Sequence, residues 1–261
     1  MSAGRLHIAL ERRLRNCGNV ETLGVRPNFS DYSDQERDLI CRAPKIYYPS
    51  TFYADMFAAM GKPIFPSVHT YRFVQDKIRQ TAMFDLAGIP TPRTRTFYGR
   101  RIRDRILSSF DFPMVGKIPR GSALGRGVFL LEDEKDLDRY LELPRPAYIQ
   151  EYLPVDRDMR IVVIGGRIVC AYWRIAHAGE FRTNLGQKGR LSLDPVASGA
   201  AELALHTAKV CGWDDVGLDI CGHGTNLYVL EANMKYGRQG LVAAGIDYSQ
   251  MMEEMIEKGW I

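Results

Sequence analysis

The stretch VGLDICGHGTNLYVLEAN, residues 216–233, decides the fold. Two apolar runs flank a central turn rich in glycine and asparagine, and this pattern predicts a hairpin of two strands. Asp219 lies on the first strand, while Glu231 and Asn233 lie two residues apart on the second and therefore point to the same face. With the turn centred near Thr225, Asp219 lies almost opposite Glu231.

This hairpin is a candidate metal site, because two carboxylates and one amide oxygen converge on one spot. Like charges placed so closely repel each other, and a divalent cation between them removes the repulsion. Ligand sets made only of oxygen favour Mg²⁺ or Mn²⁺ over zinc. The apolar neighbours predict a buried sheet, where acids need a partner; the alternative is a set of exposed strand positions that bind nothing.

Composition and length limit the class of protein. The 261 residues suit one to two domains, and 46% hydrophobic with 25% charged residues is ordinary globular composition. The net charge of +4 is too small to require nucleic acid. No run of about 18 apolar residues predicts a membrane span, and the charged start argues against a secretory signal. Five cysteines without a CxxC pair predict free thiols in a cytoplasmic protein.

Strand and helix patterns fill the chain before and after the hairpin. Residues 1–69 predict a small leading α/β domain, because a strand–helix–strand pattern runs through 45–66. A helix is expected over 76–87, ended by Gly88. Further strands are predicted over 112–118, 128–131, 148–153, 160–164 and 167–173, and further helices over 134–141, 200–211 and 248–256.

A lysine followed by a glycine-rich loop is a candidate phosphate site. Lys117 ends an apolar strand, and the loop GSALGRG follows at 121–127. Glycines let backbone N–H groups approach an anion closely, and the lysine adds a positive charge. The loop fits neither GxxxxGK[ST] nor GxGxxG, so a flexible hairpin loop is the alternative. Lys77 offers a second cation, and the loop residues expected near phosphate are Gly121, Ser122, Gly125 and Gly127.

Two other groups of residues are candidates for nucleotide contacts. The strand exit at 150–153 presents backbone groups that suit an adenine edge, and Asp158 offers a carboxylate for ribose hydroxyls. Arg174, Arg182 and Asn184 could stabilise charge that develops during phosphoryl transfer. Taken singly, these features also fit an ordinary strand exit and surface arginines.

The stretch 93–105 holds six arginines interleaved with Phe97 and Tyr98. Such a pattern is compatible with RNA contact, but it lacks an RRM-type or zinc-finger signature. A solvated face or a domain linker is the favoured interpretation, and an RNA-associated basic protein is the alternative. The motifs HExxH and GxSxG are both absent, so the sequence supports neither a zinc protease nor a nucleophilic hydrolase.

Taken in order, these motifs resemble the ATP-grasp fold, and RimK-type carboxylate–amine ligases in particular, over about residues 65–261. The resemblance implies an α+β class, with two α+β subdomains clasping ATP in residues 70–261. The lid subdomain would cover about 94–150 and the metal-binding subdomain about 151–261, after a shortened leading domain at 1–69. The matching motifs are Asp76-Lys77, AGIPTP (87–92), Pro113–Lys117, GSALGRGV (121–128), Gln150-Glu151-Tyr152, Asp158-Met159-Arg160, Phe181–Asn184, Gly217–Ile220 and Leu230–Asn233.

The resemblance also implies roles for individual residues. Lys77 and Lys117 would contact phosphates, Arg174 or Arg182 would act catalytically on the transferred phosphoryl group, and Mg²⁺ (two ions, with Mn²⁺ as an alternative) would neutralise its charge. The remaining implied contacts are Gln150, Glu151, Tyr152 and Leu153 for adenine, Asp158 for ribose, the loop glycines and Ser122, Arg182 and Asn184 for phosphate, and Asp219, Glu231 and Asn233 for the metal.

By the same resemblance, the chain would be a ligase that forms an amide or peptide bond through an acyl phosphate and releases ADP and phosphate. Its substrates would be ATP, a small carboxylate and an amine, or a peptide, with glutamate as a candidate. A non-catalytic nucleotide-binding protein is the alternative, and a homo-oligomer stays open. Residues 234–237, MKYG, depart from the small residue, proline and glycine that are common there, next to the expected acceptor site.

Overall fold

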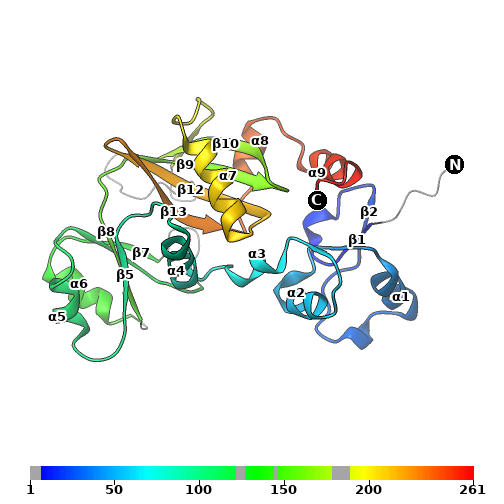
Figure 1. Cartoon of the computed structure of the whole chain (residues 1–261), viewed down its shortest axis with the longest axis horizontal. Coiled ribbons are helices and arrows are strands. Elements are labelled where there is room, and N and C mark those ends of the chain that lie inside the picture. Colours follow the sequence, from blue (N-terminus) through cyan, green and yellow to red (C-terminus); the bar gives the residue numbers. More distant parts are fainter. Residues whose placement is uncertain (1–6, 122–126, 144–145, 178–188) are drawn as a thin grey trace.

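The computed structural model describes residues 7–121, 127–143, 146–177 and 189–261, and within them the strands form three sheets (Figure 1). The leading sheet is parallel in the order β2-β1-β3-β4. The predicted strand–helix–strand pattern is confirmed by β3, α2 and β4. The elements of this part are β1 (His7–Ala9), β2 (Val20–Thr22), α1 (Asp34–Arg42), β3 (Ile46–Tyr47), α2 (Ser50–Ala59) and β4 (Ile64–Phe65).

The second sheet is antiparallel in the order β5-β8-β6-β7, and two helices pack against it at one end of the molecule (Figure 1). Its buried core joins side chains of all these elements, among them Phe97, Ile106, Met114, Leu137 and Ile149. The elements are β5 (Thr94–Phe97), α5 (Ile102–Leu107), β6 (Met114–Lys117), β7 (Val128–Leu131), α6 (Glu134–Leu141) and β8 (Ala147–Glu151).

The arginine-rich stretch 93–105 contributes strand β5 and the start of helix α5 to this part of the fold, so it is not a linker. Five of its six arginines are exposed, as the interpretation as a solvated face predicts. Several of its arginines hold the sheet and its helices together. Arg103 pairs with Asp138 at 2.7 Å, and Arg105 donates to the backbone oxygen of Tyr98 at 2.9 Å. These internal contacts explain why arginine recurs here without a nucleic-acid signature.

The central sheet is antiparallel in the order β11-β10-β9-β12-β13 and contains the predicted hairpin as β12 and β13. In its register Asp219 lies opposite Glu231, and a bulge follows directly after Asp219. The turn glycines of the β9–β10 hairpin, Gly165 and Gly166, both have positive φ, as such a turn requires. The strands are β9 (Arg157–Ile164), β10 (Arg167–Ile175), β11 (Arg190–Ser192), β12 (Asp215–His223) and β13 (Asn226–Asn233).

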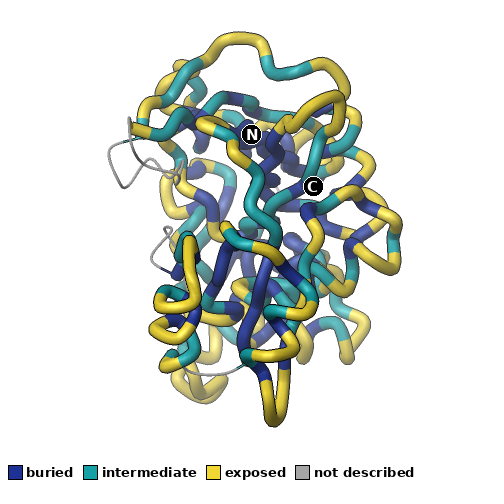
Figure 2. The backbone as a smooth tube through the Cα atoms, turned by 90° about the vertical axis from the view of Figure 1, so that its left-hand side faces the viewer, coloured by how far each residue is buried: buried dark blue, intermediate teal, exposed yellow. Residues whose placement is uncertain are grey.

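The two faces of the central sheet differ in chemistry because side chains alternate along each strand. One face carries Met159, Ile161 and Leu218 and packs against helices α4 (Lys77–Ala87) and α7 (Ala200–Cys211). The opposite face carries charged and amide side chains near one end of the sheet. Figure 2 shows the strands as buried segments inside an exposed rim of loops. A polar cluster is thereby held on a rigid, well-packed support.

The end of the chain returns to the leading sheet. Helix α8 (Gln239–Ala243) contacts β10, and α9 (Tyr248–Glu257) packs beside β1 and β2, where the C-terminus also lies (Figure 1). Met252 and Ile256 of α9 share one core with Leu14 and Tyr47. Helix α3 (Val68–Arg72) spans the predicted boundary at residue 69, which stays a prediction. None of the described helices is long and apolar enough to cross a membrane.

Gly116 on β6 is expected to tolerate no side chain. A Cβ at this position would lie 2.8 Å from the ring of Tyr140. That ring cannot move freely, because its hydroxyl donates to the Lys117 oxygen at 2.8 Å and accepts from the Tyr148 amide at 2.9 Å. We expect Gly116→Ala to lower the free energy of unfolding by about 1–3 kcal/mol. Urea unfolding measures this, and Gly222→Ala, where the nearest atom is 3.7 Å away, should change stability by less than about 0.5 kcal/mol.

Candidate active site

Lys77 is brought to the polar face of the central sheet by the start of helix α4. Gln80, one turn later, is buried and bonds the backbone of Ala232 on β13 through both atoms of its amide, at 2.8 and 3.1 Å. This contact fixes the helix against the strand. Lys77 is 5% exposed, and its Nζ lies 3.1 Å from Oε1 of Glu231.

Lys117 reaches the same place from the second sheet. It ends β6, and two residues later the backbone oxygen of Pro119 accepts from the Lys77 amide at 2.9 Å, which ties β6 to the start of α4. Lys117 is 7% exposed. Burial lowers the pKa of Lys117 from its ordinary 10.5 to about 8; Glu231 opposes this shift, and Lys77 adds to it. Two buried cations therefore face one carboxylate.

Asp219 lies beside Glu231 and is surrounded by donors. Arg160, its neighbour on β9, binds both of its oxygens, and Arg174 on β10 donates to Oδ2 at 2.9 Å. Asn233 donates to the same Oδ2 at 3.0 Å. Burial alone would raise the pKa of Asp219, but the two arginines outweigh burial and lower this pKa below its ordinary value. The two arginines thus favour the charged form of Asp219.

Asp158 is paired with Arg174 and lies away from solvent. It is 2% exposed, and its two oxygens accept from Arg174 at 2.6 and 2.7 Å. The predicted ribose contact at Asp158 is therefore not supported by this geometry, since the carboxylate is already used and enclosed. Its visible effect is to orient Arg174 toward Asp219. Arg174 itself is 5% exposed and lies in the cluster, next to the predicted metal ligands.

The three residues predicted to bind metal lie together. Asp219 and Glu231 are opposite each other, and Asn233 touches Asp219. Within the described ranges no group of three His, Cys, Asp or Glu side chains is gathered, so a cation here would rely on two carboxylates and one amide. Among the described residues, the Oδ1 atom of Asp219 accepts from Arg160 alone, which leaves it a lone pair. This all-oxygen set fits a hard divalent cation such as Mg²⁺.

The predicted adenine segment begins at the end of β8, an inner strand of the second sheet, and continues past it. Gln150 is buried and donates to the Thr94 hydroxyl at 2.8 Å, so its side chain supports the strand. Glu151 accepts from the Arg93 amide at 2.6 Å. Tyr152 and Leu153 are half-buried beyond the strand end. The roles of all four in binding adenine stay predictions.

The glycine loop and the second arginine segment are only partly described. Gly121 has φ +67°, a conformation that favours glycine, and the Gly127 oxygen accepts from the Ile118 amide at 2.7 Å, closing the loop's base. The predicted phosphate contacts Ser122, Gly125, Arg182 and Asn184 fall outside the described residues.

Sequence reasoning did not assign a role to Arg160, although it stands in the cluster's centre. The signal was present: Asp158 and Arg160 are two residues apart on a strand, so they share a face, and pairing of β9 with β12 brings Arg160 to Asp219. Gly217 makes room for it, because a Cβ there would lie 3.0 Å from the Arg160 side chain. The predicted repulsion between acids is thus already offset by arginines and lysines.

The lowered pKa of Lys117 predicts a pH dependence of ATP binding. In the unfolded chain the pKa of Lys117 returns to 10.5, so between pH 8 and 10.5 the unfolded chain binds more protons at this lysine than the folded chain does. The contribution of Lys117 to the free energy of unfolding therefore rises with pH over this range. Bound phosphate favours the charged lysine. We therefore expect ATP binding at pH 8 to take up about half a proton, measured by calorimetry in two buffers of different protonation enthalpy. Lys117→Arg, always charged, should abolish the uptake, and equal heats in both buffers for the unchanged chain would contradict it.

Comparisons with known proteins agree with this arrangement. The RimK-like ATP-grasp domain matches residues 74–256. A probable alpha-L-glutamate ligase 2 of Pseudoalteromonas atlantica is 34% identical, over 82% of this chain and 75% of the relative. A ribosomal protein bS6–L-glutamate ligase of Salmonella paratyphi B is 30% identical with the same coverage. The crystal structure of a RimK domain protein from Sphaerobacter thermophilus has a TM-score of 0.70 at 18% identity and covers 95% of this chain and 98% of its own.

The sheets and the charged cluster between them define an ATP-grasp ligase, an α+β enzyme that binds ATP between two subdomains. The chain belongs to the RimK-like ATP-grasp family. It is therefore an ATP-dependent ligase that forms carbon–nitrogen bonds, and the predicted family, fold class and enzyme class are confirmed. The alternative of a non-catalytic nucleotide-binding protein is set aside.

Proposed function

We propose that this ligase joins the amine of L-glutamate to a carboxyl group of a peptide or protein. One observation carries the proposal: two buried lysines, Lys77 and Lys117, converge on Glu231, which lies opposite Asp219. Such a site suits the charge of a triphosphate held for attack by an acid. The names of two relatives, both L-glutamate ligases, support glutamate as the amine.

The proposed reaction has two steps. A carboxylate oxygen of the acceptor attacks the γ-phosphorus of ATP, and the bond from that phosphorus to the β-phosphate oxygen breaks. The products of this step are ADP and an acyl phosphate on the acceptor. The ammonium of glutamate first loses one proton to solvent, and the neutral amine then attacks the acyl carbon; the bond to the phosphate oxygen breaks, and the departing phosphate takes the second proton. Lys77 and Lys117 hold the phosphate oxygens of ATP. Arg174 stabilises the negative charge of the transferred phosphoryl group, next to Asp219. We assign Asp158 the positioning of Arg174, because both its oxygens bind that guanidinium.

Asp219, Glu231 and Asn233 are the residues that would hold Mg²⁺. When bound, the cation neutralises phosphate charge and helps to align the reacting groups. We propose two ions, with Mn²⁺ as an alternative that the same oxygens accept. Segment 151–153 would bind adenine, and Arg182 and Asn184 would reach the phosphates. The requirement for ATP and the free cysteines favour a cytoplasmic reaction.

The test measures ADP release with ATP, Mg²⁺, L-glutamate and an acceptor, followed by mass spectrometry of the acceptor. We would use purified bS6 and short peptides that end in glutamate, since a relative is named for that ribosomal protein. Glutamate-dependent ADP release together with added glutamyl residues is the expected result. ADP release with other amino acids, and none with glutamate, would contradict the proposed substrate while leaving the ligase class intact.

A further inference from the structure

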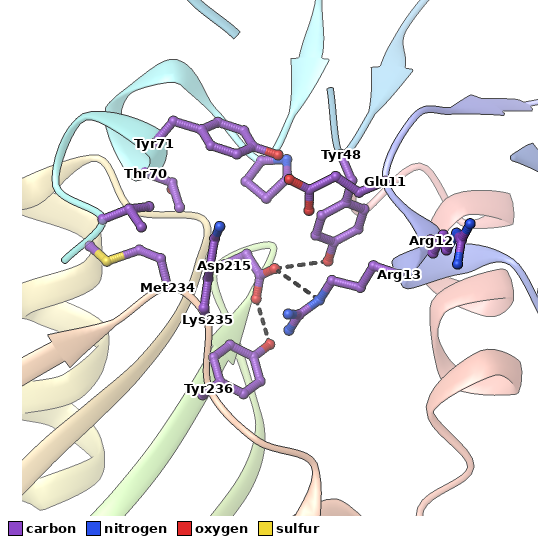
Figure 3. A pocket seen from close by; sticks show the side chains of 12 residues that line it. Glu11, Arg12, Arg13, Tyr48, Thr70, Tyr71, Asp215, Met234, Lys235 and Tyr236 are labelled. Atoms are coloured by element: carbon purple, nitrogen blue, oxygen red, sulfur yellow. Dashed lines mark hydrogen bonds and ion pairs between the residues drawn. The ribbon is translucent and has the colours of Figure 1, made fainter. Parts of the chain in front are cut away.

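A pocket of about 310 Å³ lies beyond the end of β13, between the leading sheet and the central sheet (Figure 3). Its walls include Glu11 and Arg13, which follow β1, and Met234 and Lys235, which directly follow Asn233. The pocket therefore lies next to the strand end that carries Asn233 and reaches the leading sheet, although none of the three predicted metal ligands lines it. Asp215, which also lines the pocket, is four residues before Asp219, or about 13 Å along β12.

Asp215, at the floor of the pocket, already has hydrogen-bond partners within the protein. Asp215 is 1% exposed and accepts hydrogen bonds from the hydroxyls of Tyr48, at 2.8 Å, and Tyr236. Arg13 approaches the same carboxylate, with Nε 3.8 Å from Oδ2 (Figure 3). Asp215 therefore serves to join the two sheets and is not left over for a ligand.

Arg13, in contrast, retains an unused donor. Its guanidinium lies among the rings of Tyr48, Tyr236 and Tyr248, and its Nε donates to the Tyr248 hydroxyl at 3.0 Å. Its Nη2 is buried without a hydrogen-bond partner among the described residues. A buried charged donor without an acceptor is costly, so a ligand with an anionic oxygen would gain from binding here.

Glu11 supplies the opposite charge in the same pocket. Its backbone is fixed, since its amide donates to the Tyr48 oxygen at 2.9 Å. Its carboxylate makes no hydrogen bond or ion pair within the described part of the chain. Burial raises the pKa of Glu11, and Lys235 and Arg13 oppose that shift. Figure 3 shows the Glu11 and Lys235 side chains entering the pocket from opposite walls.

We propose that this pocket holds the incoming amino acid, with Glu11 binding its ammonium and with Arg13 and Lys235 binding its α-carboxylate. The pocket offers one anionic and two cationic groups, which matches a zwitterion and not a polyphosphate. Its volume suits a single amino acid. The inference rests on the proposed function, and it assigns specificity to Glu11, which lies outside the ATP-grasp motifs, and to Lys235, in the segment MKYG that departs from the common pattern.

The test compares acids that differ only in the ammonium group. Calorimetry with the full chain and a non-hydrolysable ATP analogue would measure binding of L-glutamate against glutarate, L-aspartate against succinate, and L-alanine against propionate. We expect at least one amino acid to bind about tenfold or more tightly than its partner. In Glu11→Gln the ratio for that pair should fall to nearly one, a change that mere loosening of the fold would not produce.

Two further variants separate the roles. Lys235→Gln, at an exposed position, should weaken the binding of both acids of the pair equally and leave the ratio of their affinities unchanged. Arg12→Gln is the matched control, because Arg12 lines the rim but is set apart from the other side chains in Figure 3. Retained discrimination in Glu11→Gln, or no discrimination in any pair, would overturn the pocket assignment. Discrimination only with a pair other than glutamate would instead overturn the proposed substrate.

Discussion

Replacement of Glu231 by glutamine is expected to lower ATP turnover by about three orders of magnitude while the fold persists. Glutamine has nearly the same shape, so the strand and its neighbours stay in place, and the Glu231 side chain is 25% exposed. The lost charge is what matters. Without it, Lys77 and Lys117 lie close together with no carboxylate between them, and a divalent cation loses one of its two anionic ligands.

Steady-state ADP release and urea unfolding of the Glu231→Gln protein measure the two parts of this expectation. Glu254→Gln on α9 removes the same charge from an exposed pair with Lys258, the residue just after that helix, and serves as the control, with unchanged turnover. The pKa of Lys117 should also fall further, since Glu231 is the strongest of the charges that raise it, ahead of Asp219. Wild-type turnover in Glu231→Gln would refute the assignment of the whole carboxylate cluster.

Much of this site could be predicted because it depends on local periodicity. Asp219 lies opposite Glu231 as predicted with a turn centred near Thr225, but the turn joins His223 to Asn226, and the bulge after Asp219 brings these two acids into register. Lys117 could be found as a charge at the end of an apolar strand. The stretch 93–105 was harder, because its arginines mask a short strand and helix whose apolar residues are few.

The pocket next to the site could not be found from the sequence alone. Glu11, Thr70, Asp215 and Lys235 are far apart in the chain, and no period connects them. They meet because α9 and the Tyr48–Asp215–Tyr236 contacts hold the leading sheet against the central one. Tertiary packing of two separately patterned parts creates such a pocket, and only a structure reveals which polar groups are left without a partner.

Loss of Arg160 is expected to destabilise the protein strongly. Arg160 and Asp219 are both 8% exposed in their side chains and share a two-pronged contact. Removing one partner of such a buried pair leaves an incompletely compensated charge, and measured cases lose about 3–5 kcal/mol. Arg174 also binds Asp219, so we expect Arg160→Met to lose about 3 kcal/mol, at the low end of that range.

The double variant Arg160→Met with Asp219→Asn separates stability from catalysis. The neutral amide that replaces the Asp219 carboxylate no longer needs the guanidinium, and Arg174 keeps its pair with Asp158 at 2.6 Å. We therefore expect urea unfolding to show most of the lost stability restored, while ATP turnover stays at least about 100-fold below wild type because an anionic ligand is missing. A double variant as unstable as Arg160→Met would mean that Arg160 acts through its packing against Gly217 and Tyr172. Recovery of turnover together with stability would show that Asp219 only supports the sheet, and the metal would then have to be held by Glu231 and Asn233 without it.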